Sequence, residues 1–94
     1  MLFLLTFRFP RGDFWETITA DERAIVALQY DYLAKIQDEG RLRFAGRAED
    51  KTFGIAIVDV ADEAEATAIV ESSPAVAQKL YRGEVKPYLL PIEG

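Results

Sequence analysis

The first nine residues are apolar on both sides of an extended chain, and this feature constrains the fold more than any other segment. Alternate side chains of a strand point to opposite faces. The two faces would carry, in turn, Phe3, Leu5, Phe7 and Phe9, and Leu2, Leu4, Thr6 and Arg8. A small antiparallel sheet usually keeps one face polar and solvated. Because both faces here are largely apolar, we expect helices over one face and a second copy of the chain over the other.

The length and the composition indicate one globular domain. The 94 residues are predicted to form a single unit, 1–94. A chain this short buries about 60–65% of its unfolded surface, so its core is thin and dimerisation would stabilise it. The hydrophobic fraction of 50% is typical of a folded protein rather than a disordered one.

The sequence carries no membrane-spanning or secretory pattern. The apolar run Leu2–Leu5 is far shorter than the about 20 residues of a bilayer span. Arg8 and Arg11 interrupt it where a signal peptide would stay apolar. No cysteine is present, so no disulfide framework points to an oxidising compartment. We therefore expect a cytoplasmic protein with no membrane partner.

The net charge of −5 argues against a nucleic-acid partner. Proteins that bind nucleic acids depend on lysine and arginine side chains that contact phosphates. A short basic stripe is present at Arg41, Arg43 and Arg47. We interpret it as a solvated or pocket-facing side of a strand.

The pattern of hydrophobic residues predicts the element order β-α-β-β-α-β. After the first strand, Pro10–Ile18 is predicted to be a loop. Thr19 and Glu22 form a capping box that begins a helix, and Gly40 suits the left-handed end of that helix. The remaining predicted elements are strands at 41–48 and 52–60, a helix at 63–72, a helical turn at 75–80 and a last strand at 84–92.

This order is that of the ferredoxin-like split βαβ fold. The predicted fold class is therefore α+β, a ferredoxin-like βαββαβ sandwich with both helices on one face of the sheet. Two such sheets packed face to face would form a homodimer, a dimeric α+β barrel, and dimers could stack into a higher oligomer.

The long helix has an apolar stripe with a glutamine inside it. The stripe consists of Ile25, Leu28, Tyr32, Leu33 and Ile36. A buried Gln29 must find hydrogen-bond partners. Gln29 therefore either satisfies a neighbouring group or lines a small-molecule cavity, and Tyr30 and Tyr32 can likewise be core residues or ligand contacts.

The absence of histidine and cysteine excludes several reaction classes. Histidine is the commonest general base near neutral pH, and cysteine would be needed for thiol chemistry. A metal site would have to use carboxylates alone, which suits zinc and iron poorly. No glycine-rich phosphate motif is present. We therefore expect no metal and no cofactor.

The remaining candidates are an aspartate, two arginines and two aromatic residues. Asp59 ends the strand at 52–60; if buried, it would have the raised pKa of a general base, and if solvated it would not. Arg43 and Arg47 could hold a ligand carboxylate or pair with acidic side chains. Phe14 and Trp15 precede the long helix and could shape the mouth of a pocket or fold back to plug the end of the sheet.

Three stretches, in order and at these spacings, resemble the YCII-related family. They are Leu33–Gly46, Ala64–Pro74 and Val85–Tyr88. The resemblance implies a ferredoxin-like fold that dimerises into an α+β barrel. More loosely, the opening Met1–Leu4 and the chain length are similar to muconolactone isomerase, another dimeric α+β barrel enzyme.

The resemblance also implies a catalytic pair that this chain lacks. The family's histidine on the first helix falls at Gln29, its aspartate before a proline falls at Ser73, and its Gly-Pro falls at Gly46 and Arg47. No catalytic role carries over, but the location of a cavity does. Gln29 and Ser73 could hydrogen-bond a ligand there, and Arg47 could add a charge.

Three functions remain open at this point. The first is binding of a small anionic organic molecule, for which the candidate residues are Gln29, Tyr32, Arg43, Gly46, Arg47 and Ser73. The second is a small-molecule lyase or isomerase that uses Asp59 or a tyrosine as base. The third is a structural subunit whose pocket is filled by its own side chains. A cavity of about 300 Å³ or more would favour a binder or an enzyme.

Overall fold

The elements follow one another in the predicted order, with one addition. The computed structural model describes residues 1–90. Its elements are β1 (Leu2–Arg8), α1 (Phe14–Thr17), α2 (Ala20–Asp38), β2 (Leu42–Arg47), β3 (Phe53–Asp59), α3 (Glu63–Ser72), α4 (Pro74–Ala77) and β4 (Arg82–Pro87). The addition is α1, a single turn inside the segment that was predicted to be a loop.

The four strands form one antiparallel sheet in the order β2-β3-β1-β4. The first strand is central: Leu5 lies opposite Ala56 of β3 on one side and Val85 of β4 on the other. This is the ferredoxin-like arrangement, so the predicted α+β fold class is confirmed.

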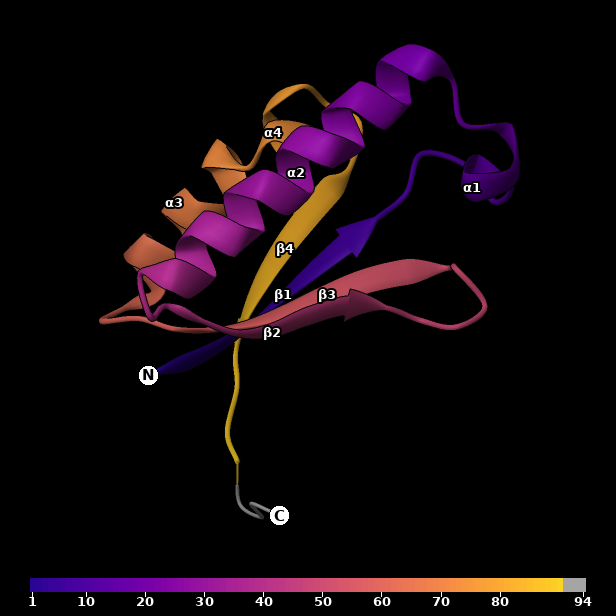
Figure 1. The fold of residues 1–94 in the computed structure, drawn as a ribbon. Helices are drawn as coiled ribbons and strands as arrows, with labels where there is room; N and C mark the ends of the chain where they lie inside the picture. Colours follow the sequence, from indigo (N-terminus) through magenta and orange to yellow (C-terminus); the bar gives the residue numbers. More distant parts are fainter. Residues whose placement is uncertain (91–94) are drawn as a thin grey trace.

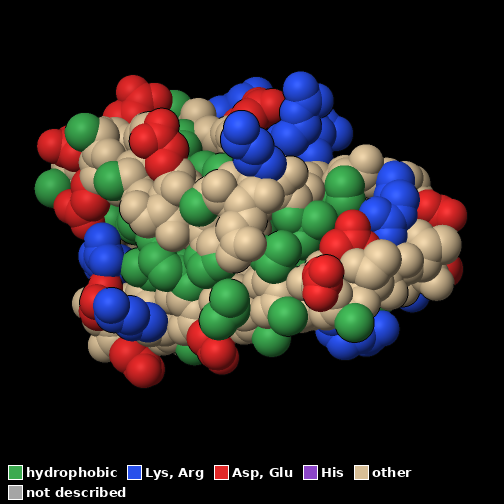
Figure 2. Space-filling view, turned by 90° about the horizontal axis from the view of Figure 1, so that it is seen from above, with side chains coloured by type: hydrophobic (Ala, Val, Ile, Leu, Met, Phe, Trp, Pro, Cys, Tyr) green, Lys and Arg blue, Asp and Glu red, His purple; other side chains and the backbone are tan. Residues whose placement is uncertain are grey.

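The helices lie on one side of the sheet and leave the other side uncovered (Figure 1). The helix-facing side chains of β1 are buried, with Phe3, Leu5 and Phe7 at most 5% exposed. On the other side, Phe44 and Phe53 are 54% and 42% exposed. Seen from above the helices, acidic and basic side chains lie scattered around hydrophobic patches (Figure 2).

Helix ends follow the local sequence. Thr19 Oγ1 accepts a hydrogen bond from Glu22 N at 3.1 Å, and Thr19 N donates to Glu22 Oε1 at 2.9 Å, so the predicted capping box begins α2. Gly40, with a φ of 78°, follows the end of this helix. Asp62 Oδ1 accepts from Glu65 N at 2.9 Å and begins α3.

The buried face of α2 differs from the predicted stripe. Leu28 is 50% exposed, whereas Val26, Gln29 and Ile36 are at most 6% exposed. The sequence contains apolar residues on both flanks of the stripe, so packing against the sheet and α4 decides which flank is buried.

The strand β2 contains an irregularity that the alternating sequence does not reveal. The pairing with β3 shifts register between Leu42 and Phe44. Because an extra residue in one strand reverses the side to which later residues point, Arg47 returns to the helix-facing side that Leu42 occupies. Arg43 points to the opposite side, where its guanidinium meets Asp59.

The last strand begins and ends earlier than predicted. Arg82 and Gly83 already pair with Arg8 and Phe7 of β1. The strand ends at Pro87, which has no amide hydrogen for a further ladder bond. The predicted end of this strand at 91–92 lies outside the described residues. No helix within residues 1–90 is long and apolar enough to span a membrane.

Candidate functional site

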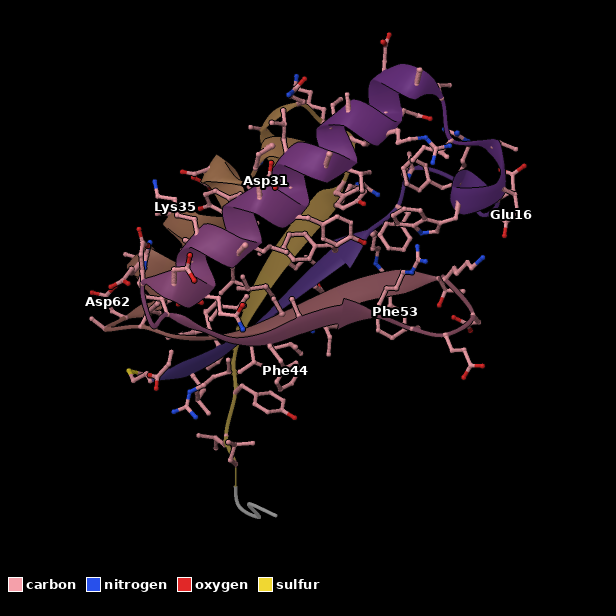
Figure 3. The ribbon with its side chains drawn as sticks, in the orientation of Figure 1. Glu16, Asp31, Lys35, Phe44, Phe53 and Asp62 are labelled. Atoms are coloured by element: carbon pink, nitrogen blue, oxygen red, sulfur yellow. The ribbon has the colours of Figure 1, made fainter. Side chains whose placement is uncertain are left out.

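A cavity of about 370 Å³ lies between α2 and the β2–β3 side of the sheet. Val26, Gln29 and Leu33 of α2 form its roof, and Ala45, Gly46, Arg47 and Gly54 belong to its floor and edge. Figure 3 shows aromatic rings in the space between α2 and the strands. Ala45 and Gly54, which point to the helix-facing side, are small, and this leaves the space open.

One end of the cavity is closed by a cluster of aromatic rings. The ring centroids of Phe9 and Trp15 are 5.2 Å apart, those of Phe9 and Tyr81 5.1 Å, and those of Phe14 and Trp15 4.9 Å. Phe14 is 1% exposed and belongs to the core, whereas Trp15 lines the cavity. Two roles were predicted for these residues. Phe14 folds back to plug the end of the sheet, and Trp15 forms part of the pocket wall.

The short helix α1 is held in place by Arg11. Arg11 Nη1 and Nη2 bind Glu22 Oε2 and Oε1 at 2.8 and 2.9 Å, and its Nε donates to Thr17 Oγ1 at 2.8 Å. The hydrogen bonds from Arg11, and next the one from the Thr19 amide, lower the pKa of Glu22 to about 2. A bidentate pair of this kind fixes both distance and orientation, so it sets the position of Trp15.

Gln29 joins α2 to α4 and also faces the cavity. It is 3% exposed, and its Oε1 accepts a hydrogen bond from Ala75 N at 2.9 Å. Because a backbone N–H can only donate, this contact fixes the orientation of the amide. Gln29 Nε2 is buried and has no hydrogen-bond partner. Gln29 therefore accepts a hydrogen bond from Ala75 through Oε1, and its Nε2 remains as a donor for a ligand.

A second unpartnered donor lies beside a cation. Trp15 Nε1 is buried without a hydrogen-bond partner. The guanidinium of Arg47 lies 4.1 Å from the centroid of the Trp15 ring, in cation–π geometry. Arg47 forms no ion pair with any side chain in residues 1–90. A cation and an N–H donor thus share one wall of the cavity.

Tyr81 contributes a hydroxyl that the sequence did not single out. It is 7% exposed and lines the cavity next to the aromatic cluster. Burial first, and then Tyr30, raise its pKa to about 12 against the opposite effect of Arg47. The hydroxyl is therefore protonated at neutral pH. In the sequence, Tyr81 is an aromatic residue just before the last strand, and a core residue at this position would look the same.

Two of the predicted ligand contacts lie away from the cavity and bond to the backbone at helix junctions. Ser73 is 1% exposed and its Oγ donates to Val70 O at 2.7 Å, at the junction of α3 and α4. Tyr32 OH donates to Ile69 O at 2.9 Å, where α2 meets α3. Neither residue lines the cavity. Of the predicted set, the fold brings Gln29, Gly46 and Arg47 together at the cavity.

Asp59 and Arg43 lie on the uncovered side of the sheet. Asp59 Oδ2 is 2.9 Å from Arg43 Nη2, and its Oδ1 is 3.1 Å from the Met1 amino group. Its side chain is 37% exposed. These two cations, Arg43 first, lower the pKa of Asp59. Of the two possibilities for Asp59, the structure places it on the solvated side, and with a lowered pKa it is ill suited to act as a general base.

The cavity can donate hydrogen bonds and positive charge, and no carboxylate from residues 1–90 lines it. Within the same residues, no cluster of acidic side chains could hold a metal ion. The arrangement can therefore stabilise acceptor oxygens and negative charge on a bound molecule, while its buried walls offer no evident base.

Comparison with known proteins agrees with this fold. The family model of the YCII-related domain matches residues 1–88. A solved structure with a similar fold is the 5-chloro-2-hydroxyhydroquinone dehydrochlorinase TftG from Burkholderia phenoliruptrix AC1100, in complex with 2,5-dihydroxybenzoquinone. The TM-score is 0.71 at 19% sequence identity, over 95% of this chain and 94% of that chain. This likeness concerns the fold alone.

No curated protein sequence matches the chain. The family model, in contrast, spans almost all of it, from the first strand to the end of the last one. The order of elements, the capped helices and the cavity beneath α2 fit that match. The chain belongs to the YCII-related domain family.

Proposed function

We propose that this protein binds a small anionic organic molecule with a flat ring in the cavity between α2 and the β2–β3 side of the sheet. The volume of about 370 Å³ exceeds the roughly 300 Å³ at which ligand pockets begin. The aromatic cluster suits the faces of a ring, and Arg47 suits a negative charge.

One observation carries the proposal: two buried N–H donors of the cavity wall have no partner. They are Gln29 Nε2 and Trp15 Nε1. A buried donor left unpaired costs about 1–3 kcal/mol. A ligand oxygen that accepts from either donor would recover part of that cost. The guanidinium of Arg47, which pairs with no acidic side chain in the described chain, supplies the matching charge.

The structural neighbour suggests a class of ring. The TftG structure holds 2,5-dihydroxybenzoquinone, a flat ring with acceptor oxygens. A molecule of this size and polarity is compatible with the aromatic walls and the donor groups of the present cavity. We therefore propose hydroxylated or carboxylated aromatic and quinone-like rings as the class to test.

The test is a binding titration read by tryptophan fluorescence. Trp15 is the single tryptophan of the chain, so its emission reports directly on the cavity wall. The probes are 2,5-dihydroxybenzoquinone and benzoate, with neutral benzamide for comparison, and calorimetry gives a readout without optical interference. We expect saturable binding of the anions and weaker binding of benzamide. Absence of saturable binding for every probe would contradict the proposal.

A pair of arginines on one strand provides a matched control. Arg47→Met removes the charge at the cavity and should weaken anion binding by about tenfold or more, because hydrogen bonds to charged groups contribute roughly 1.5–3 kcal/mol. Arg43→Met removes a charge on the opposite side of the sheet and should leave affinity unchanged. Equal effects of the two changes would place the ligand elsewhere.

We expect no turnover by an acid–base pair, because Gln29 and Ser73 occupy the positions of the family's histidine and aspartate. The lyase or isomerase alternative lacks support from Asp59, whose pKa is lowered, and from Tyr81, whose pKa of about 12 makes it a poor base at neutral pH. The purely structural alternative is disfavoured by the open cavity. A cytoplasmic location stays a prediction of the composition.

We also propose that a second copy covers the uncovered side of the sheet. Phe44 and Phe53 expose 54% and 42% of their surface there. The outward residues of the edge strand alternate in charge, with Arg82, Glu84 and Lys86, which suits a self-complementary two-fold interface. Sedimentation should give a dimer or a multiple of it, and Phe44→Glu should dissociate it. A wild-type monomer at high micromolar concentration would contradict this proposal.

A further inference from the structure

Polar groups of four cavity-lining residues share one property: each can donate a hydrogen bond, with those of Gln29, Trp15 and Tyr81 buried and Arg47 exposed. Gln29 Nε2 comes from α2, Trp15 Nε1 from α1 and the guanidinium of Arg47 from β2. The Tyr81 hydroxyl, which precedes β4, keeps its proton at neutral pH. Gln29 Oε1, the acceptor of the same amide, is already occupied by Ala75 N.

The charges around the cavity also favour a bound anion. Its charged or titratable lining groups are Arg47, Tyr30 and Tyr81, while β1 and β3 contribute apolar residues and glycine. The two segments next to the cavity, α1 and the turn after β2, carry Glu16 and Lys51, which pair with each other at 3.9 Å. Arg47 is thus the one lining cation, and no lining anion from residues 1–90 opposes it.

We propose that this cavity selects the ionised form of a weakly acidic ring compound, a phenol or an enol, over its neutral form. The inference rests on the proposed function, since it names the protonation state of the ligand at the same site. Gln29 Nε2, Trp15 Nε1 and the Arg47 guanidinium cannot accept the O–H of a neutral phenol, so its proton depends for a partner on a hydroxyl such as that of Tyr81. The phenolate oxygen accepts from the same groups and balances the charge of Arg47.

Preferential binding of the anion must lower the pKa of the bound ligand by linkage. At a pH between the bound and the free pKa, binding then releases a proton to solvent. Apparent affinity should rise with pH up to the free pKa of the ligand and then stay level. A tenfold preference for the anion corresponds to a shift of about one pH unit.

The test uses 4-nitrophenol, whose anion is yellow and whose neutral form is nearly colourless. Protein is added at a pH about one unit below the free pKa, and the yellow band is followed. We expect the band to grow with protein concentration, with a bound pKa lowered by about one unit. Calorimetry in two buffers of different ionisation enthalpy should show proton release. The ether 4-nitroanisole, which has no proton to lose, should bind at least about tenfold more weakly.

Three variants locate the effect. Arg47→Met should abolish most of the pKa shift, Arg47→Lys should keep it because the charge remains, and Arg43→Met should leave it unchanged. Melting curves confirm that each variant is folded. Binding of 4-nitrophenol with an unshifted pKa would overturn this inference and leave the proposed function standing. Absence of binding by calorimetry at every pH would overturn both.

Discussion

The two halves of the helix-covered side use small residues in opposite ways. In the packed half, where α3 lies on β4 and β1, a Cβ at Gly83 would overlap Val70 Cγ1 and lie 3.2 Å from Val76 Cγ2. In the open half, where α2 faces β2, the atoms nearest to a Cβ at the helix-facing Gly54 would be Gly46 O at 3.3 Å and Phe9 Cζ at 3.7 Å, neither of which belongs to a helix. A small residue permits close helix packing in the first half and leaves a cavity in the second.

Gln29 stands at the boundary between these halves. Its Oε1 accepts from the Ala75 amide of the packed half, whereas its Nε2 is buried without a partner in a residue that lines the open half. The candidate site thus arises where no large side chain fills the space under α2. Gln29, at the boundary, stabilises the fold through Oε1 and offers Nε2 for recognition. Three experiments test the difference between the packed half and the open half.

The largest effect is expected from filling a small position in the packed half. Gly83→Val should lower the free energy of unfolding by about 3 kcal/mol, because the new side chain overlaps α3 and overpacking costs roughly 1–3 kcal/mol or more. The matched control, Gly54→Val, should lower it clearly less, because no helix atom is among the nearest neighbours of its Cβ and the cavity has room for the methyl groups. Urea denaturation measures both. Equal losses at the two positions would remove the distinction between the halves.

A smaller loss is expected at the boundary. Gln29→Leu leaves the Ala75 amide buried without an acceptor, which should cost about 1–3 kcal/mol of unfolding free energy. The same change removes the Nε2 donor and should also weaken ligand binding. Gln37→Leu changes another glutamine of α2 that lines the cavity but is exposed, so stability should stay unchanged. If Gln29→Leu altered neither stability nor affinity, its double role would be refuted.

The smallest effect is expected on acidification, and it concerns α1 at the closed end of the cavity. The pKa of Glu22 is lowered from 4.5 to about 2 in the folded protein, so its contact with Arg11 stabilises the fold above pH 4.5. That contribution is lost as the pH falls from about 4.5 towards 2. We expect Trp15 fluorescence to change in this range before the amide protons of α3 lose protection from exchange.

Glu22→Gln is the control for this acid response, since it removes the titrating group. The variant should lose the part of the pH dependence that lies between about pH 4.5 and 2. Simultaneous loss of protection in α1 and α3 of the wild-type protein would show that the two halves do not open separately.

Much of the fold could be predicted because its signals are local. The capping box at Thr19, the end of α2 near Gly40 and the start of α3 after Asp62 depend on residues within one turn of each other. The placement of Gln29 on a buried helix face followed from helical periodicity. The first strand, apolar on both faces, pairs with both β3 and β4.

The parts of the site that could not be predicted depend on contacts between distant segments. Tyr81 reaches the cavity because its ring packs on Phe9, which is far away in the sequence. Ser73 and Tyr32 instead donate their hydroxyls to backbone oxygens of α3, at Val70 and Ile69. A single turn, α1, forms where Arg11 can bind Glu22 of the next helix.

The sequence by itself determined the order of elements, the helix ends and the apolar first strand, because periodicity and capping act over a few residues. Only the tertiary structure decided which arginine serves the cavity. The register shift between Leu42 and Phe44 turns Arg47 towards α2 and leaves Arg43 with Asp59 on the other side. A strand reverses its faces with a shift of one residue, and the pairing with β3 that sets this shift depends on the whole sheet.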